Sequence, residues 1–322
     1  MSGPALFAVD AGGSLTRVLV GGGAGPRELE SVNPHSAGAG ADATLRAAFG
    51  ALSELLPAGP AVGWLASAAV DPDRPDAELA RVARCAAAAG LRAELVVSND
   101  VLPLLWGSPG LEGTGIVLVA GTGSGFLGAD RSGRVARAGG CEWLGSDEGG
   151  GSDIGQAGLR AAVRAADGRG PATELVTTLT AAAGVPPPEL ARRLAAEPFP
   201  KRGLAALAPP VCAGWLAGDQ VATGIVRAAV AELVRGVRAV RDRLALPAGF
   251  AVAAAGGVVA GCPPLFAQLA DRLRVELGAG RVELVVDTAA AVLAALARVV
   301  AASGRPQLPA GLLGRHAWVL PP

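Results

Sequence analysis

The chain alternates between short apolar runs and longer segments in which apolar residues recur every three or four positions. The short runs are bounded by Gly, Pro, Asn or Asp and predict buried strands at residues 7–20 (a hairpin), 60–67, 94–98, 115–119, 125–128, 251–255 and 282–286. The periodic segments predict helices at residues 42–56, 75–89, 288–302 and most of 154–246. Strands mixed with helices in this way indicate an α/β fold.

The first segment, residues 7–20, has the pattern of strand, glycine turn and strand, with Asp10 at the turn. Gly12 and Gly13 let the backbone approach a ligand closely, so that its N–H groups can point at phosphate oxygens. A carboxylate at this place can hold a magnesium ion or its waters. The same residues are also compatible with an ordinary hairpin in which Asp10 only stabilises the turn.

A second copy of this pattern favours the phosphate site. Residues 119–124 repeat the frame of residues 9–14, again between two apolar strands. Two such hairpins, about one small domain apart, are typical of an internally duplicated nucleotide-binding fold. Neither hairpin has the Gly-Lys-Ser/Thr ending of a P-loop or the full dinucleotide-binding glycine spacing. We therefore expect hairpins, and not one helix N-terminus, to hold the phosphates.

Composition narrows the class of protein. A chain of 322 residues can form two domains with separate cores, and its 28 basic and 28 acidic residues indicate neither nucleic acid nor an anionic membrane as partner. The uncharged stretch 250–270 contains the pairs Gly256-Gly257 and Pro263-Pro264, which favours a strand, a turn and a helix over a membrane span. Four scattered cysteines and the absence of a signal-peptide pattern predict a cytoplasmic protein with reduced thiols.

Two polar positions at strand or loop ends are candidates for chemistry. Asp100 follows the apolar run 94–98, and open α/β sheets gather their ligands at the carboxyl ends of strands. Asn99 or Asp100 is equally suited to cap a helix beginning near residues 101–103. Asn33, just before Pro34, is a candidate substrate ligand or an ordinary turn residue.

Residues 139–155 are rich in glycine and acids, more than packing alone requires. A flexible loop with solvated charges would show the same composition, but Trp143 and Ile154 favour a folded site. The glycine-rich stretch 107–113 predicts a linker. We therefore expect an N-terminal domain at residues 1–112 and a C-terminal domain at 113–302. The second contains a helical insertion, its last helix returns to the first domain, and residues 303–322 form a loosely structured tail.

These residues together resemble the actin, hexokinase and Hsp70-like ATPase superfamily, and within it the group that joins N-acetylglucosamine kinases to the BadF/BadG/BcrA/BcrD-type ATPases. The resemblance spans about residues 5–302. It rests on five motifs in the expected order: the first phosphate motif (10–17), the connecting segment (98–100), the second phosphate motif (121–124), the acidic-glycine loop (145–155) and the adenosine motif (255–258). Ala11 stands where the family usually has glycine. Residues 140–143 stand where the sugar kinases usually have Gly-Trp-Gly, which leaves the identity of the sugar open.

The resemblance implies duplicated ribonuclease H-like (actin-like ATPase) domains with a nucleotide cleft between them. It also implies a kinase that uses ATP and Mg²⁺ to phosphorylate an amino sugar, N-acetylglucosamine or glucosamine, to its 6-phosphate, and it is compatible with a homodimer. Asp100 would be the catalytic base, and Asp10 would organise Mg²⁺. ATP would contact Asp10, Gly12, Gly13, Ser14, Thr16, Gly121, Thr122, Gly123, Ser124, Gly256 and Gly257. The sugar would contact Asn33, Asp100, Thr122, Asp147 and Glu148.

Two other functions remain open. The first is a BadF-type ATPase that activates a partner dehydratase through an iron-sulfur cluster; this role requires paired subunits with closely placed cysteines, whereas the four cysteines here are scattered along the chain. The second is a nucleotide-dependent regulatory module without catalysis. The joint presence of Asp10, Asp100 and Asp147 disfavours it.

Overall fold

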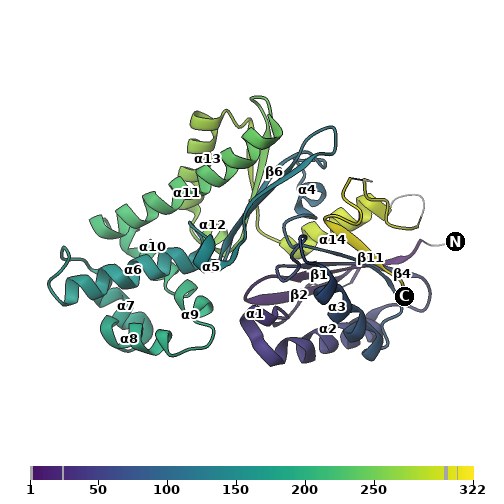
Figure 1. Ribbon diagram of the computed structural model, residues 1–322, viewed down its shortest axis with the longest axis horizontal. Coiled ribbons are helices and arrows are strands. Elements are labelled where there is room, and N and C mark those ends of the chain that lie inside the picture. Colours follow the sequence, from purple (N-terminus) through teal and green to yellow (C-terminus); the bar gives the residue numbers. More distant parts are fainter. Residues whose placement is uncertain (1–2, 24, 301–303, 310) are drawn as a thin grey trace. The chain divides into compact units, whose positions relative to one another are not determined.

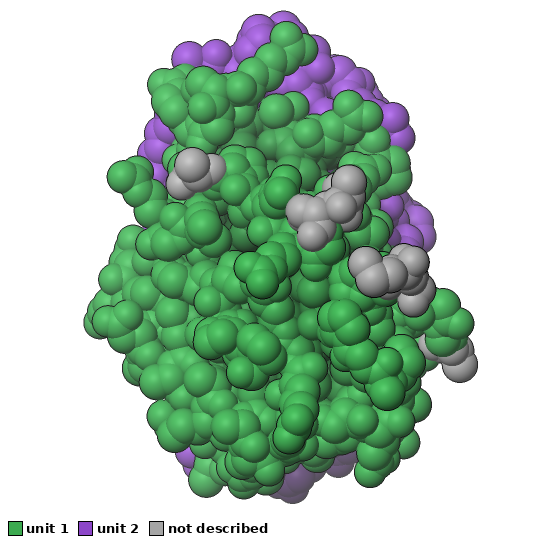
Figure 2. All heavy atoms as spheres, turned by 90° about the vertical axis from the view of Figure 1, so that its right-hand side faces the viewer, with its two compact units in different colours: residues 1–117, 127–136, 287–322 green, residues 118–126, 137–286 purple. Residues whose placement is uncertain are grey.

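The computed structural model describes residues 3–23, 25–300, 304–309 and 311–322. It separates into two compact units, each assembled from more than one stretch of chain. Unit 1 comprises residues 1–117, 127–136 and 287–322, and unit 2 comprises residues 118–126 and 137–286. In Figure 2, which colours the two units differently, the segments of unit 1 form one continuous mass of atoms.

Unit 1 contains a six-stranded sheet with the order β11-β5-β4-β1-β2-β3. Figure 1 labels β1, β2, β4 and β11 of this sheet. Its strands are β1 (Ala5–Ala11), β2 (Leu15–Val20), β3 (Arg27–Glu30), β4 (Ala61–Ser67), β5 (Glu94–Ser98) and β11 (Ala317–Leu320). Strands β1, β4 and β5 are parallel neighbours, whereas β2, β3 and β11 are each added by an antiparallel pairing. The carboxyl ends of β1 and β5 therefore lie at the same edge of the sheet, on either side of β4.

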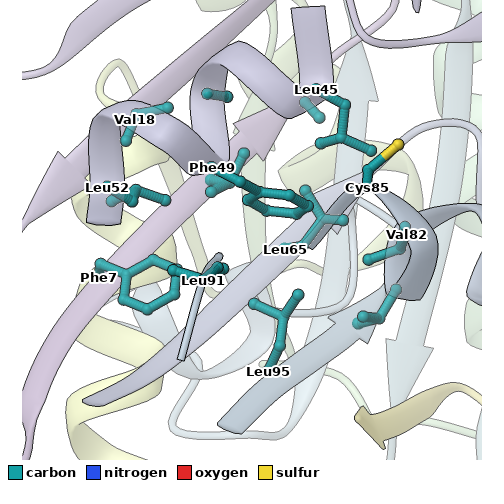
Figure 3. Close-up of a cluster of buried hydrophobic side chains, with 14 of the residues drawn as sticks. Phe7, Val18, Leu45, Phe49, Leu52, Leu65, Val82, Cys85, Leu91 and Leu95 are labelled. Carbon is teal, nitrogen blue, oxygen red and sulfur yellow. The ribbon is translucent and has the colours of Figure 1, made fainter. Parts of the chain in front are cut away.

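Two helices, α2 (Ala41–Leu55) and α3 (Asp76–Ala88), close the core of this sheet. Helix α2 buries Leu45, Phe49 and Leu52, whose spacing of three and four residues places them on one face. Figure 3 shows these side chains beside Phe7 and Leu65 of the strands. Strand β4 is buried along its whole length, as expected of a central strand with parallel neighbours.

The last helix, α14 (Thr288–Val300), packs against β1 and α4 (Leu104–Gly107). A Cβ atom on Gly107 would lie 2.0 Å from the backbone oxygen of Ala291, so glycine allows α4 to approach α14 this closely. Leu296 of α14 is fully buried, whereas Leu293 is only half-buried. The predicted end of this helix near Ala302 lies outside the described residues.

Most of unit 2 is helical. Its helices are α5 (Glu142–Gly145), α6 (Gly151–Ala166), α7 (Leu175–Ala183), α8 (Pro187–Ala195), α9 (Lys201–Ala205), α10 (Ala208–Leu216), α11 (Gln220–Leu244), α12 (Gly257–Gly261) and α13 (Pro263–Leu277). Strand β9 (Ala251–Ala255) and helix α13 confirm the strand and the helix predicted for the uncharged stretch, whereas the short helix α12 lies where a turn was predicted. No helix in the described part of the chain is both long and apolar enough to cross a bilayer.

A second sheet has the order β10-β9-β6-β7-β8. Its remaining strands are β6 (Gly115–Ala120), β7 (Ser124–Ala129), β8 (Val135–Gly139) and β10 (Arg281–Val285). Strands β9 and β10 are parallel, and the hairpin β6–β7 is the second glycine hairpin of the sequence. Both predicted glycine hairpins are thus formed between adjacent strands.

Three strands depart from the prediction: β8, at the edge of the second sheet, and two edge strands of unit 1. Strand β3 has the sequence Arg-Glu-Leu-Glu, which lacks an apolar run, and it forms because pairing with β2 satisfies its backbone at the sheet edge. Strand β11 lies in the segment predicted to be loosely structured, and it pairs with β5 from Ala317 to Leu320. Together with the short helices α1 (Pro34–Ala37) and η1 (Gly38–Gly40), these strands complete the elements of unit 1.

Candidate functional site

Asp10 is the next-to-last residue of β1, and its side chain is half-buried. Its Oδ2 accepts a hydrogen bond from the hydroxyl of Thr288. Burial raises the pKa of Asp10; the Thr288 hydrogen bond and the charge of Arg17 oppose this, and Asp287 adds to it, so that the net pKa is raised. A buried carboxylate of this kind gains when a cation binds, because the cation stabilises its charged form. Asp10 therefore fits a Mg²⁺ ligand by donor type and by electrostatics.

Asp100 follows β5 at the same edge of the sheet. Burial and, less strongly, the negative charge of Asp10 together raise the pKa of Asp100 to about 7, against hydrogen bonds from the backbone N–H groups of Asp100 and Val101. The influence of Asp10 means that the structure brings the two predicted acids of unit 1 together. A carboxylate with a pKa near neutrality can accept a proton at physiological pH, as a general base must.

The cap predicted for Asn99 or Asp100 is wrong. Residues 100–103 form a turn, α4 begins only at Leu104, and Pro103 occupies its N-cap position. Asn99 shapes this turn instead: its Oδ1 accepts from the Val101 N–H at 3.1 Å, and its Nδ2 donates to the Val70 carbonyl oxygen at 3.3 Å. The carboxylate of Asp100 is thus not needed to begin a helix.

The first glycine hairpin is tied to the loop that carries Asn33. The Ser31 hydroxyl lies 3.3 Å from the Gly12 carbonyl oxygen and 3.2 Å from that of Gly13, to which it donates. Ser31 Oγ also accepts from the backbone N–H of Asn33 at 3.2 Å. One hydroxyl therefore connects the predicted phosphate loop to the predicted sugar ligand.

Thr16 has a supporting position in this arrangement. It is fully buried, and its Oγ1 accepts from the Val32 N–H at 3.2 Å. The buried Arg81 donates to the Val32 carbonyl oxygen at 3.0 Å and pairs with Glu78 at 2.6 Å. Thr16 therefore lies in the interior of unit 1, where it holds the loop, and not at a surface that a nucleotide could reach.

In unit 2, the acidic-glycine loop lies directly on the second hairpin. The Gly151 N–H donates to the Gly121 carbonyl oxygen at 2.8 Å, and the Ser152 N–H donates to that of Thr122 at 2.9 Å. From the other side, the Ser124 hydroxyl donates to the Glu148 carbonyl oxygen at 2.8 Å. These bonds make residues 121–124 and 147–152 one assembly.

Asp147 is the centre of that assembly. It is 4% exposed, and its Oδ1 accepts from the Ser124 N–H at 3.0 Å. A Cβ atom on Gly123 would lie 2.4 Å from this same oxygen, so only glycine leaves room for the carboxylate. Gly256 of the predicted adenosine motif packs against the same hairpin, since its Cβ would lie 2.5 Å from the Ala120 carbonyl carbon. Gly257, in contrast, faces open space.

The second oxygen of Asp147 is paired with Lys201, the only lysine of the chain, at 2.7 Å. Lys201 also contacts Glu142 at 2.8 Å. Burial lowers the pKa of Lys201, but the hydrogen bonds to Asp147 and Glu142 outweigh burial, and the net pKa is raised. Asp147 is therefore a neutralised, fixed carboxylate, whereas the neighbouring Glu148 is exposed.

A pocket of about 140 Å³ opens on this loop. It contains both predicted sugar-binding acids of unit 2 and is lined by residues 143–148, Ser152, Asp153 and Gln156. Its wall combines carboxylates, hydroxyls, an amide and an indole, a mixture suited to a ligand with both polar and apolar groups. The structure thus gathers Gly121 to Ser124, Asp147, Glu148 and Gly256 in unit 2, and Asp10, Gly12, Gly13, Asn33 and Asp100 in unit 1.

Three contributors were missed by the sequence analysis. Thr288 contacts Asp10 across 278 residues of chain, Ser31 supports the candidate sugar ligand Asn33, and Lys201 pairs with Asp147. No local pattern marks Thr288 or Ser31. The rarity of lysine was the one signal that could have drawn attention to Lys201.

Two of the four cysteines, although far apart in the sequence, lie together in the fold. The thiols of Cys212 and Cys262 are hydrogen-bonded to each other in the interior of unit 2. Burial and the adjacent Cys262 together raise the pKa of Cys212 to about 12. A thiol with such a high pKa is a poor source of the thiolate that metal ligation requires.

Known proteins resemble this chain in sequence and in fold. An N-acetylmuramic acid/N-acetylglucosamine kinase of Clostridium acetobutylicum is 33% identical over 173 residues, which are 53% of this chain and 56% of the kinase, so the likeness covers little more than half of that relative. The crystal structure of a candidate N-acetylglucosamine kinase from Chromobacterium violaceum is 26% identical with a TM-score of 0.64, covering 91% of this chain and 99% of that one. A ROK family glucokinase from Streptomyces griseus, solved with glucose and AMPPNP, is 19% identical with a TM-score of 0.54, covering 90% and 97% of the two chains, and shows the shared fold.

The family comparison agrees with the site. The sequence profile of the BadF/BadG/BcrA/BcrD ATPase family matches residues 79–296, which include Asp100, the second hairpin, the acidic-glycine loop and Gly256. This match covers more than half of the chain. The protein therefore belongs to the BadF/BadG/BcrA/BcrD ATPase family and has the α/β fold of the actin-like ATPases and sugar kinases.

Proposed function

We propose that the protein is an ATP-dependent kinase of amino sugars. The observation that carries this proposal is Asp100, an acid with a pKa of about 7 at the carboxyl end of a parallel strand, near a second acid suited to Mg²⁺. A phosphotransferase needs these two functions together: a proton acceptor for the attacking hydroxyl and a metal ligand for the phosphates. The kinases named among the relatives support the same class of reaction.

In this proposal, the sugar hydroxyl oxygen forms a bond to the γ-phosphorus of ATP while the bond from that phosphorus to the bridging oxygen breaks. The hydroxyl proton passes to Asp100, and ADP leaves. Asp10 would hold Mg²⁺, which supplies charge neutralisation at the phosphates. Gly12, Gly13, Ser14 and residues 121–124 would surround the phosphates. The N–H groups of Gly121 and Ser124 already bond Gly123 and Asp147, so these two residues would shape the phosphate loop while its other residues donate. Gly256-Gly257 is assigned to adenosine.

The sugar contacts are assigned to Asn33, Thr122, Asp147 and Glu148, with Asp100 at the reacting hydroxyl. Glu148 is exposed, whereas Asp147 is held by Ser124 and Lys201. A carboxylate has about four acceptor positions, so Asp147 can accept from a sugar hydroxyl in addition to these partners. Thr16 supports the first hairpin from the interior and is not assigned a ligand contact.

We propose N-acetylglucosamine, phosphorylated at its 6-hydroxyl, as the substrate, with glucosamine as the alternative. The names of the Clostridium and Chromobacterium proteins support an amino sugar. The test is ATP consumption against a panel of glucose, glucosamine, N-acetylglucosamine and N-acetylmuramic acid, with the product position determined by NMR. Turnover restricted to a non-amino sugar, or none with any sugar, would contradict the proposal.

A second candidate is an ATPase that activates a partner enzyme, because the matched family is named for ATPases and the resemblance described above implies this role for some of them. That role, as the resemblance describes it, needs thiolates that hold an iron-sulfur cluster. The only pair of thiols in contact within the described residues is buried, with the pKa of Cys212 raised to about 12. The test is an assay of iron and acid-labile sulfide on anaerobically purified protein. Stoichiometric iron would favour this candidate over the kinase.

A further inference from the structure

Ser152 carries a hydroxyl that the protein itself leaves unsatisfied. The residue is 2% exposed, and within the part of the chain that the structure describes its Oγ has no hydrogen-bond partner. Its backbone is fixed, because its N–H donates to the Thr122 carbonyl oxygen at 2.9 Å. A buried hydroxyl without a partner costs free energy, so such a group is a reason to look for a ligand that completes it.

Ser152 lines the pocket of about 140 Å³ described above. That volume is close to that of a cavity known to admit benzene, and so it is large enough for a substituent of a few heavy atoms. The rim of the pocket is apolar: Trp143 is 37% exposed and Leu144 is 84% exposed. An indole and a leucine left this open to solvent beside a polar pocket provide an apolar contact for part of a ligand.

The same pocket has acceptors. Glu148 is exposed, and Asp153 is half-buried with one carboxylate oxygen accepting from the Gly149 N–H at 2.9 Å. No lysine or arginine is among the residues that line the pocket in the described part of the chain. The pocket therefore offers a hydroxyl donor, carboxylate acceptors and an apolar rim in one small space.

We propose that this pocket is an acetamido subsite. Ser152 Oγ donates to the carbonyl oxygen of an N-acetyl group, Glu148 or Asp153 accepts from its N–H, and Trp143 with Leu144 contacts its methyl group. An unmodified hydroxyl or a free ammonium group would use the carboxylates but leave the apolar rim without a partner. The inference rests on the proposed kinase function, and it assigns the preference for N-acetylated sugars to residues of α6 and α5.

The test compares Ser152→Ala with Ser108→Ala. Ser108 is the matched control, because its hydroxyl is also fully buried and without a partner among the described residues, but it lies in unit 1 and does not line the pocket. The measurement is the ratio of kcat/KM for N-acetylglucosamine to kcat/KM for glucosamine. We expect the ratio to fall about 3- to 10-fold in Ser152→Ala, the effect of one lost hydrogen bond, and to stay at the wild-type value in Ser108→Ala.

Two further readouts keep the outcome clear. Melting temperature should not fall in Ser152→Ala, because the substitution removes an unsatisfied group and no protein contact. Saturation-transfer NMR should show magnetisation reaching the acetyl methyl protons of N-acetylglucosamine in wild type, and less in Trp143→Ala. An unchanged ratio in Ser152→Ala, or a wild type that prefers glucosamine, would overturn the subsite while leaving the kinase intact. No turnover of any sugar by wild type would instead refute the proposed function.

Discussion

The two glycine hairpins have nearly the same sequence frame but opposite electrostatic surroundings. Beside the first hairpin, burial raises the pKa values of both Asp10 and Asp100. Asp10 accepts a hydrogen bond from the Thr288 hydroxyl but forms no ion pair among the described contacts. Beside the second, Asp147 has one oxygen on the Ser124 N–H and the other on the Lys201 ammonium. The hairpin of unit 1 thus has acids whose charge is not neutralised, whereas the hairpin of unit 2 has its charge already balanced.

The glycines differ in the same way. At Gly123, a side chain would collide with the Asp147 carboxylate, so the glycine is required by the folded protein itself. At Gly12, the nearest atom to a Cβ would be the Leu15 carbonyl oxygen at 3.5 Å, an ordinary contact, and its φ is not positive. A glycine that packing does not require is better explained by a ligand, so similar motifs can keep glycine for different reasons.

The largest effect that would test this contrast between the two hairpins is the loss of activity expected on replacing Asp100. Replacing Asp100 by Asn removes the proton acceptor, and kcat should fall about 10²–10⁴-fold, as is typical for loss of a general base. Steady-state kinetics with the best sugar of the panel measure this effect. Wild-type kcat/KM should also decline as pH falls below about 7, where Asp100 becomes protonated. If the Asp100→Asn enzyme retains wild-type kcat, Asp100 is not the proton acceptor of the reaction.

The same variant should be more stable than wild type at high pH. The folded pKa of about 7 lies above the ordinary value of 3.8, so the stability linked to protonated Asp100 is fully present below pH 3.8 and is lost as pH rises through about 7. Asn does not titrate. We therefore expect a gain on the order of 1 kcal/mol at pH 8, after allowance for solvent screening, that disappears toward pH 4. Urea unfolding at the two pH values separates this gain from any general change in packing.

In unit 2, the expected loss is one of stability. Lys201→Met leaves the Asp147 carboxylate buried without its cation, and the free energy of unfolding should fall by about 1–3 kcal/mol, less than for a fully buried pair because Lys201 is partly exposed. Lys201→Arg keeps the charge and is the control. Denaturant unfolding at pH 8 is the measurement. Equal stability of Lys201→Met and wild type would mean that the charge of Asp147 is not balanced by this contact.

The smallest effects come from alanine at the two hairpin glycines. Gly123→Ala should lower the free energy of unfolding by at least about 1 kcal/mol, because Asp147 or the hairpin must move. Gly12→Ala should change stability by no more than about 0.5 kcal/mol, but it should weaken ATP binding by crowding the phosphates. Calorimetric titration with ATP and thermal unfolding of both variants test whether Gly123→Ala mainly lowers stability and Gly12→Ala mainly weakens ATP binding. If both variants lose stability equally, the two glycines have the same role.

The sequence predicted those features that depend on neighbours in the chain. The hairpins, the acid at the end of β1, Asp100 after β5 and the strand-helix pattern at residues 251–277 follow from local spacing, and the structure confirms these elements. The contacts that set the chemistry are long-range. Thr288 meets Asp10 across the length of the chain, and Lys201 reaches Asp147 from a helix in the insertion, so neither contact has a local signature.

Strands β3, β8 and β11 were missed, and each lies at a sheet edge. Strands β3 and β8 lack the continuous apolar run that marks a strand and are defined by the backbone of their neighbours. Strand β11 is an apolar run of only four residues in a segment rich in glycine and proline. The position of Asp100 was predicted, but its surroundings were not, since the turn at residues 99–103 is built from contacts of Asn99 with Val70 and Val101.

The pairing of β11 with β5 has a consequence for synthesis of the protein on the ribosome. Unit 2 is complete once residue 286 has emerged, so it can fold while the chain is still being made. Unit 1 begins the chain but needs α14 and the strand at residues 317–320 to close its sheet beside the strand that precedes Asp100. Unit 1 is therefore finished after unit 2, although most of its strands precede unit 2 in the chain, and strand β5 has one edge unpaired until residues 317–320 have been made.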